Sequence, residues 1–181
     1  MAFGRPRKLF TEPELYEYAV GALARRSRSV AELKRLLRNR VEADTEFGKT
    51  LVELIIVRLK DQGYLNDAKY AAAYSSYRRD TEKFGRMRVV TDLKAKGVHG
   101  EVIETAVASA YDEVKEEDLA RSYLKRKRLQ KPTDQKQTAR IFRNLMRAGF
   151  TSKTICTILK KWHVDDETLT GLAEEIPDSL N

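Results

Sequence analysis

The sequence of 181 residues contains one cysteine, Cys156, and only two histidines. A single cysteine excludes an internal disulfide and any zinc site built from several cysteines. His99 and His163 have no partner side chains at metal-ligand spacing, so we expect both to be ordinary loop or helix-end residues. The nine glycines are scattered and form no phosphate-binding loop. We therefore expect no enzyme, no metal and no cofactor.

Long apolar segments are also absent. Hydrophobic residues make up 41% of the chain and charged residues 34%. No apolar run approaches the roughly 18 residues that a membrane span needs. The basic N-terminal stretch MAFGRPRKLF leads into TEPELYEY instead of an apolar segment, so no secretory signal is predicted. We expect a soluble, cytoplasmic protein that does not bind membranes.

Acidic residues are scarce in one part of the chain and concentrated in another. The formal net charge is +8, from 35 basic and 27 acidic side chains. By segment, the net charge is +4 over 1–64, zero over 65–114, +10 over 115–164 and −6 over 165–181. Such an asymmetry favours a polyanionic partner over a purely solvated surface.

Apolar residues recur with helical spacing, and strand-type alternation is nearly absent. Three short segments occupy equivalent positions in the apolar pattern, 56 and then 52 residues apart: Leu33–Leu37, Val89–Leu93 and Ile141–Leu145. A period near 50 residues indicates a repeat array in which each unit buries its open face against the next. We therefore predict an all-α protein of three tandem three-helix-bundle repeats that form an elongated, curved body. The predicted divisions are a disordered N-terminus (1–12), three repeats (13–64, 65–114 and the basic 115–164) and an acidic tail (165–181).

Two local expectations accompany this division. The helix predicted over about Thr45–Gln62 ends at Gly63, with Tyr64 as the apolar residue past a glycine C-cap. Its predicted inward residues are Leu51, Val52, Leu54, Ile55 and Leu59. The tail after about Asp165 is expected to be poorly ordered, with a short turn of helix over Glu167–Ala173 as the alternative.

Basic residues in the third repeat recur along helix faces. Lys136, Arg140, Arg143 and Arg147 follow an i, i+4, i+7, i+11 pattern, opposite the apolar positions of the same helix. The further predicted binding residues of this repeat are Arg121, Lys125, Arg126, Lys127, Arg128, Lys153, Lys160 and Lys161. A solvated helix normally interleaves Glu with Lys. Because acidic residues are nearly missing here, we expect a polyanion or an acidic protein surface to neutralise these side chains.

A second basic patch, which also contains acidic residues, lies in the middle repeat. Its predicted binding residues are Arg78, Arg79, Arg86 and Arg88, with Asp80 and Glu82 among them. Tyr74 and Tyr77 could stack on bases, although tyrosines at helical spacing are more typical of a core.

The middle of the chain resembles the RecX family of bacterial recombinase regulators. The strings RLKDQGYLNDAKYAAAYSSYRR (58–79) and KFGRMRVVTDLKAKGV (83–98) carry the resemblance. The residues that match the family pattern in order are Gly63, Tyr64, Leu65, Asp67, Tyr70, Arg78, Gly85, Arg88, Leu93, Lys96 and Gly97. Asn66, Met87 and Val41 depart from it. Asn66 caps a helix as well as aspartate does, so that departure changes little.

The resemblance implies an all-helical protein that binds the RecA–DNA filament and modulates, usually restrains, recombinase and co-protease activity. It implies no catalytic residues. The expected partners are the RecA filament on single-stranded DNA and, weakly and without specificity, nucleic acid, and we expect the protein to act as a monomer. Two alternatives remain: a direct DNA-binding protein of helix-turn-helix type, and a scaffold whose basic face is merely solvated.

Overall fold

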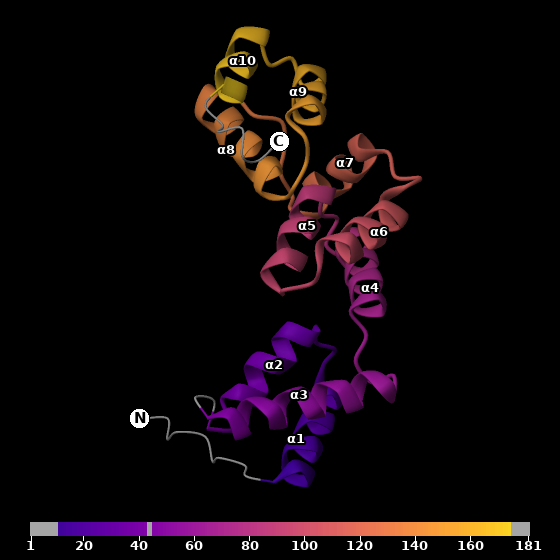
Figure 1. The fold of residues 1–181 in the computed structure, drawn as a ribbon. Helices are drawn as coiled ribbons and strands as arrows, with labels where there is room; N and C mark the ends of the chain where they lie inside the picture. Colours follow the sequence, from indigo (N-terminus) through magenta and orange to yellow (C-terminus); the bar gives the residue numbers. More distant parts are fainter. Residues whose placement is uncertain (1–10, 43–44, 175–181) are drawn as a thin grey trace. The chain divides into compact units, whose positions relative to one another are not determined.

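A computed structural model of the protein describes residues 11–42 and 45–174, and this part contains ten helices and no strands (Figure 1). The helices are α1 (Glu12–Arg25), α2 (Val30–Arg38), α3 (Glu46–Asp61), α4 (Asp67–Asp80), α5 (Arg86–Ala95), α6 (Gly100–Tyr111), α7 (Glu116–Arg126), α8 (Gln135–Arg147), α9 (Ser152–Lys161) and α10 (Asp166–Glu174). The all-α prediction is confirmed. None of the described helices combines the length and hydropathy that a membrane crossing requires.

The chain packs as two compact units. Unit 1 consists of Met1–Ala71 and Leu93–Val102, and unit 2 of Ala72–Asp92 and Ile103–Asn181. The boundary passes through α4, α5 and α6, so the middle helices contribute to both units. The division into three repeats and the curved shape stay predictions. Most of the disorder expected over 1–12 falls on residues 1–10, outside the described residues, whereas Thr11 is the N-cap of α1 and Glu12 its first residue.

The equivalent positions of the three predicted repeats are buried. Leu33, Leu37, Val89, Leu93 and Leu145 are fully buried, and Ile141 is 5% exposed. In unit 1, α1, α2 and α3 form a hydrophobic core that includes the buried residues Leu15, Ile55 and Leu59. This burial is the main stabilising contribution, because apolar area removed from water is worth about 25 cal/mol per Å².

Two residues near α3 differ from the sequence prediction. Leu54 is 49% exposed, whereas Ile56 is buried. At 100° per residue, Leu54 lies about 130° from the centre of the buried face, so it cannot share that face. Gly63 does end the helix at φ +76°, but Tyr64 is exposed and Leu65 is the buried residue past the cap.

The segment predicted as an unstructured acidic tail begins with a helix. Leu169 and Leu172 of α10 are buried in the core that unit 2 builds from α7, α8 and α9. Asp165 accepts a hydrogen bond from the Thr168 N–H at 2.7 Å and so caps the helix. The alternative of a short helix here is therefore correct, and the expected disorder is wrong up to Glu174. Residues 175–181 lie outside the described part.

Two close backbone approaches position the turn before α5 within unit 2. The Gly85 N–H donates to the Ala148 carbonyl at 2.8 Å, and the Met87 N–H donates to Gly149 at 3.2 Å. A Cβ at Gly85 would lie 2.2 Å from the Gly149 carbonyl oxygen, and a Cβ at Gly149 would lie 2.2 Å from the Arg88 nitrogen. Only glycine fits at both positions, so the start of α5 is fixed against the end of α8.

Candidate polyanion-binding site

The basic stripe on α8 lies on the exposed face of that helix. Lys136, Arg140, Arg143 and Arg147 are all exposed. The opposite face, which includes Ile141, Phe142 and Leu145, is buried. Asp134 begins the helix by accepting a hydrogen bond from the Gln137 N–H at 2.7 Å. The helix therefore presents four cations to one side, at the spacing that the sequence indicated.

Several predicted binding residues have carboxylate partners inside the molecule. Arg121 pairs with Glu117 at 2.5 Å, and Lys161 reaches the same carboxylate. Hydrogen bonds from Lys161, together with the charge of Arg121, lower the pKa of Glu117. The other such pairs are Lys160–Asp166 at 2.8 Å and Arg126–Glu82 at 3.0 Å. Sequence reasoning missed the last two pairs because Glu82 and Asp166 belong to segments outside the basic one, whereas Glu117 and Arg121 are an i, i+4 pair on one helix.

A second set of predicted cations has no such partners. Within the part of the chain that the structure describes, their side chains make no hydrogen bond or ion pair, and all are exposed: Arg86, Lys125, Arg128, Lys136, Arg140 and Lys153. Exposed pairs contribute little to stability, so neither set is needed to hold the fold. The unpaired set is the part of the surface that is free to meet an anion.

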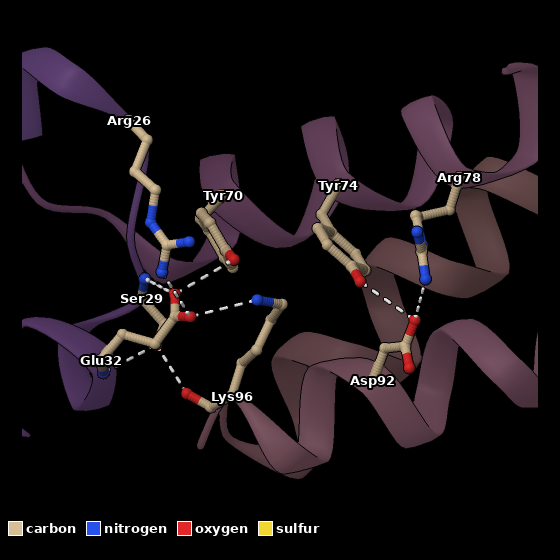
Figure 2. Close-up of polar contacts among 8 residues, drawn as sticks. All are labelled: Arg26, Ser29, Glu32, Tyr70, Tyr74, Arg78, Asp92 and Lys96. Atoms are coloured by element: carbon tan, nitrogen blue, oxygen red, sulfur yellow. Dashed lines mark hydrogen bonds and ion pairs between the residues drawn. The ribbon is translucent and has the colours of Figure 1, made fainter. Parts of the chain in front are cut away.

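Asp92 binds two of the predicted middle-repeat residues, Arg78 and Arg88. It accepts from Arg78 at 2.6 Å and from the Tyr74 hydroxyl at 3.0 Å (Figure 2). It also pairs with Arg88 at 3.0 Å. The Arg78 guanidinium also lies 4.5 Å from the centre of the Phe84 ring. Arg78 and Tyr74 thus have packing roles within unit 2, and Tyr74 is not a free stacking surface.

Arg79 is likewise engaged within unit 2. It pairs with Asp80 at 2.7 Å and donates to the Ala110 carbonyl at the end of α6. The hydrogen bond from Arg79 lowers the pKa of Asp80. Of the middle-repeat residues predicted to bind a partner, Arg86 is the one with no such contact among the described residues.

Glu32 forms the corresponding cluster in unit 1 (Figure 2). Its carboxylate accepts from the Ser29 N–H at 3.1 Å, from Lys96 at 3.1 Å and from the Tyr70 hydroxyl at 3.3 Å. Arg26 adds a 3.4 Å contact. Burial raises the pKa of Glu32, but the hydrogen bonds from Ser29 and Lys96 outweigh it and lower the pKa. Burial and the nearby Glu32 charge raise the pKa of Tyr70 to about 12.

Many residues that carry the family resemblance therefore have packing roles. Asp67 accepts from the Val30 N–H at 2.8 Å and joins the start of α4 to the start of α2. The Lys96 carbonyl accepts from the Ser29 hydroxyl at 2.6 Å. Gly97 has φ +71°, and a Cβ there would lie 2.5 Å from Ala31. These contacts explain why glycine, acidic and basic residues are needed at those positions for the fold itself.

The fold brings together cations that the sequence places in separate patches. Because Gly85 packs on Gly149, Arg88 donates to the Arg147 carbonyl at 3.5 Å. Burial raises the pKa of Tyr123, and the charges of Arg126, Arg147 and Arg88 oppose this rise. We call Arg88, Arg126 and Arg147 the arginine cluster. Tyr123 precedes Arg126 by three residues on α7, and this spacing is the one signal of their association in the sequence.

The described residues contain no group of three or more His, Cys, Asp or Glu side chains that could hold a metal ion. Burial raises the pKa of the Cys156 thiol, which is partly buried in α9. The exposed guanidinium and ammonium groups of the site are chemically suited to bind anions.

These observations define an all-helical basic protein with an exposed cationic face, and comparisons with known proteins identify the family. A family model described as "RecX, second three-helix domain" matches residues 66–107. Regulatory protein RecX of Myxococcus xanthus (strain DK1622) is 34% identical over 159 residues, which cover 81% of this chain and 84% of the relative. RecX of Bacillus pumilus (strain SAFR-032) is 31% identical, and the match covers 81% of this chain and 54% of the relative.

A solved structure shares the fold. The crystal structure of RecX from Lactobacillus salivarius is 22% identical, with a TM-score of 0.65 over 84% of this chain and 96% of that one. The similarity in sequence to the Myxococcus xanthus protein spans most of both chains. The chain belongs to the RecX family of regulatory proteins.

Proposed function

We propose that this protein binds the filament that RecA recombinase forms on single-stranded DNA and modulates its recombinase and co-protease activities in DNA repair and the SOS response. Inhibition is the expected direction, and the protein acts as a monomer in the cytoplasm. Membership of the RecX family is the observation that carries the proposal. The exposed cations of unit 2 support it, because a protein–DNA filament is a long surface with a high density of negative charge.

The proposed mode of action depends on many weak contacts and not on one catalytic site. Exposed charge pairs contribute little individually, so affinity arises from their number and from simultaneous engagement. A helical body that contacts adjacent recombinase subunits changes the rate at which subunits join or leave the filament. Charge complementarity speeds the encounter and selects the partner more than it raises the affinity.

The second candidate is a direct DNA-binding protein of helix-turn-helix type, favoured by the basic exposed face of α8. Reading base edges calls for Asn or Gln as well as Arg side chains. On α8, however, Asn144 is half-buried and its Oδ1 accepts from Arg147 at 3.4 Å. The face offers phosphate contacts more than base contacts, which predicts non-specific binding.

The test compares RecA filaments with bare single- and double-stranded DNA at about 150 mM salt, where exposed charge contacts are already weakened. We expect tighter binding to the filament and slower RecA-driven strand exchange and repressor cleavage. Equal affinity for bare DNA and filament, with RecA activity unchanged, would contradict the proposal and favour the direct DNA binder.

A further inference from the structure

Tyr123 carries a hydroxyl that the described part of the protein does not use. The residue is 7% exposed, and its side chain makes no hydrogen bond among the described residues. Its ring packs against Phe84 and Phe150, with centroid distances of 6.0 Å and 5.8 Å. Among the described residues, the buried side-chain polar atoms that lack a partner do not include this hydroxyl oxygen, so it reaches solvent and is open to a ligand. The packing therefore fixes a hydrogen-bond donor in one place and leaves it unused.

The arginine cluster draws on three different helices, and the charge of each arginine acts on the Tyr123 hydroxyl. Arg88 is on α5, Arg126 on α7 and Arg147 on α8. The Arg88 Nη1 contacts the Arg147 carbonyl at 3.5 Å, and Arg88 lies 5.7 Å from the centre of the Phe84 ring that packs on Tyr123. Lys127 adds an ammonium group 5.9 Å from the Tyr123 ring centre.

Two of these arginines are held in place by carboxylates and still have unused donors. Arg88 pairs through Nε with Asp92 at 3.0 Å. Arg126 pairs through Nη2 with Glu82 at 3.0 Å. A guanidinium has five N–H donors, so each keeps several for a further acceptor. The carboxylates act here as positioning groups.

Arg147 is held by its own helix. Its Nε donates to the Arg143 carbonyl at 3.2 Å, and Nη2 donates to Asn144 at 3.4 Å. No carboxylate pairs with it among the described residues. Asp92 and Glu82 offset the positive charge of the three arginines only in part, because Asp92 also pairs with Arg78. An additional anion would neutralise more of this charge.

We propose that Tyr123 and the arginine cluster form a binding subsite for one phosphodiester group of a nucleic-acid strand. The Tyr123 hydroxyl donates to one phosphate oxygen, and the free N–H groups of the three arginines meet the others. The choice of a nucleic-acid ligand rests on the proposed function. The subsite lies at the C-terminal end of the exposed α8 stripe, and Arg140 and Lys136 continue the stripe along the same helix face.

A phosphate fits this set of donors better than a carboxylate from an acidic protein. A carboxylate presents two oxygens in one plane, and one bidentate arginine satisfies it. Here the donors approach from three helices and a phenol, which suits a tetrahedral group. Tyrosine hydroxyls and arginines are regular partners of phosphate oxygens in nucleic-acid complexes.

The experiment measures binding of a fluorescent 20-nucleotide thymidine strand to the full chain by anisotropy, at about 100 mM salt where charge contacts remain measurable. Tyr123→Phe removes only the hydroxyl. We expect it to weaken binding about tenfold, the size of a hydrogen bond to a charged group. Arg147→Gln should weaken binding by a similar factor. Neither variant should change the affinity for a strand whose backbone is uncharged methylphosphonate.

Tyr64→Phe is the matched control, since Tyr64 is 63% exposed and lies in unit 1. It should leave binding unchanged. Unaltered affinity of Tyr123→Phe, with a native circular dichroism spectrum, would overturn the subsite. The subsite would also be overturned if the variants weakened binding of poly-glutamate instead of binding of the DNA strand. The site would then be assigned to an acidic protein. Because no recombinase is present, the proposed filament binding succeeds or fails separately.

Discussion

The Glu32 cluster of unit 1, formed by Arg26, Ser29, Glu32, Tyr70 and Lys96, contrasts with the arginine cluster of unit 2. Both gather cations and a tyrosine hydroxyl from segments that are distant in sequence. In the first, one carboxylate accepts from every donor around it. In the second, the Tyr123 hydroxyl and much of the arginine donor capacity have no acceptor among the described residues. The same residue types thus stabilise a fold in one place and, in our proposal, offer a binding surface in the other.

The difference shows that the number of basic residues in a segment says little about binding. Arg78, Arg126 and Lys161 carry the same positive charge as Arg140. A carboxylate of the same chain, however, accepts from each of the first three. What decides the role of a cation is whether the tertiary structure provides it with an internal acceptor. Each of the following variants tests this contrast.

Gly149→Ala should have the largest effect, because it disrupts the junction that assembles the arginine cluster. Its φ is +88° and a Cβ would lie 2.2 Å from the Arg88 backbone nitrogen. Strain and overpacking together predict a loss of about 3–5 kcal/mol in unfolding free energy. Gly63→Ala is the control, since φ is +76° with nothing within 4 Å, and should cost only about 1–2 kcal/mol. Equal losses in urea unfolding would show that the contact with Arg88 is unimportant.

Reversing three charges of the α8 stripe should affect binding and leave the fold intact. For Arg140→Glu, Arg143→Glu and Arg147→Glu together, we expect at least about a 100-fold loss of affinity for filament or DNA, and a salt slope about three units shallower. Helix content by circular dichroism should stay unchanged because these side chains are exposed. The control reverses Arg35, Arg38 and Lys60, exposed cations of unit 1. A similar loss in the control would mean that total charge, not the α8 face, governs binding.

Glu32→Gln tests the satisfied cluster. The pKa of Glu32 is lowered from its ordinary value of 4.5, so folding favours the ionised form. The stabilisation is therefore fully present above pH 4.5 and is lost as the pH falls through the lower, folded pKa. We expect a loss of about 1.5–3 kcal/mol at pH 7, the range for hydrogen bonds to a charged group, and a smaller difference from wild type at pH 3.

Urea unfolding at the two pH values measures this difference. Glu46→Gln is the control, because Glu46 is exposed and pairs only with Lys49 three residues along the same helix, and should change stability by less than about 0.5 kcal/mol. A Glu32→Gln deficit that is the same at pH 3 and pH 7 would contradict the role of the charge.

The acidic residues around α10 should have the smallest effect. Asp166 pairs with Lys160 at 2.8 Å, so the acidic segment competes with an external anion for at least one cation. Truncation would also remove buried Leu169 and Leu172, and amide substitutions avoid this. The variant is Asp165→Asn, Asp166→Asn, Glu167→Gln and Glu174→Gln. We expect DNA affinity to rise about two- to fivefold at low salt, with the gain disappearing as salt screens the charges.

The control for this variant neutralises Glu17, Glu42, Glu46 and Asp61, four exposed acids of unit 1. Because the same number of charges changes, an equal gain in the control would reduce the effect to net charge. An unchanged affinity in the α10 variant would refute competition by this segment.

Most of the helices and their buried faces were predictable from local pattern. The spacing of Leu33, Val89 and Ile141 predicted three equivalent apolar positions, and all three are buried. Ser29 and Glu32, which follow the S-x-x-E sequence pattern, form a capping box at the start of α2. Leu54 was misplaced because a one-residue error around a helix moves a side chain by 100°. The helix α10 was underestimated because its acidic residues suggested a solvated tail, whereas two leucines and an aspartate cap determine its structure.

The sequence by itself determined the all-helical class, the amphipathic basic face of α8, the family and the absence of any recognisable catalytic motif, because each depends on spacing within a short segment. The tertiary structure alone decided which cations are neutralised. Glu82 meets Arg126 and Arg88 meets Arg147 only after residues tens of positions apart are folded together. Tyr123 illustrates the same limit: its spacing is that of an apolar helix position. Only the packing of α5, α7 and α8 brings the charges of three arginines to bear on its hydroxyl, which has no hydrogen-bond partner among the described residues.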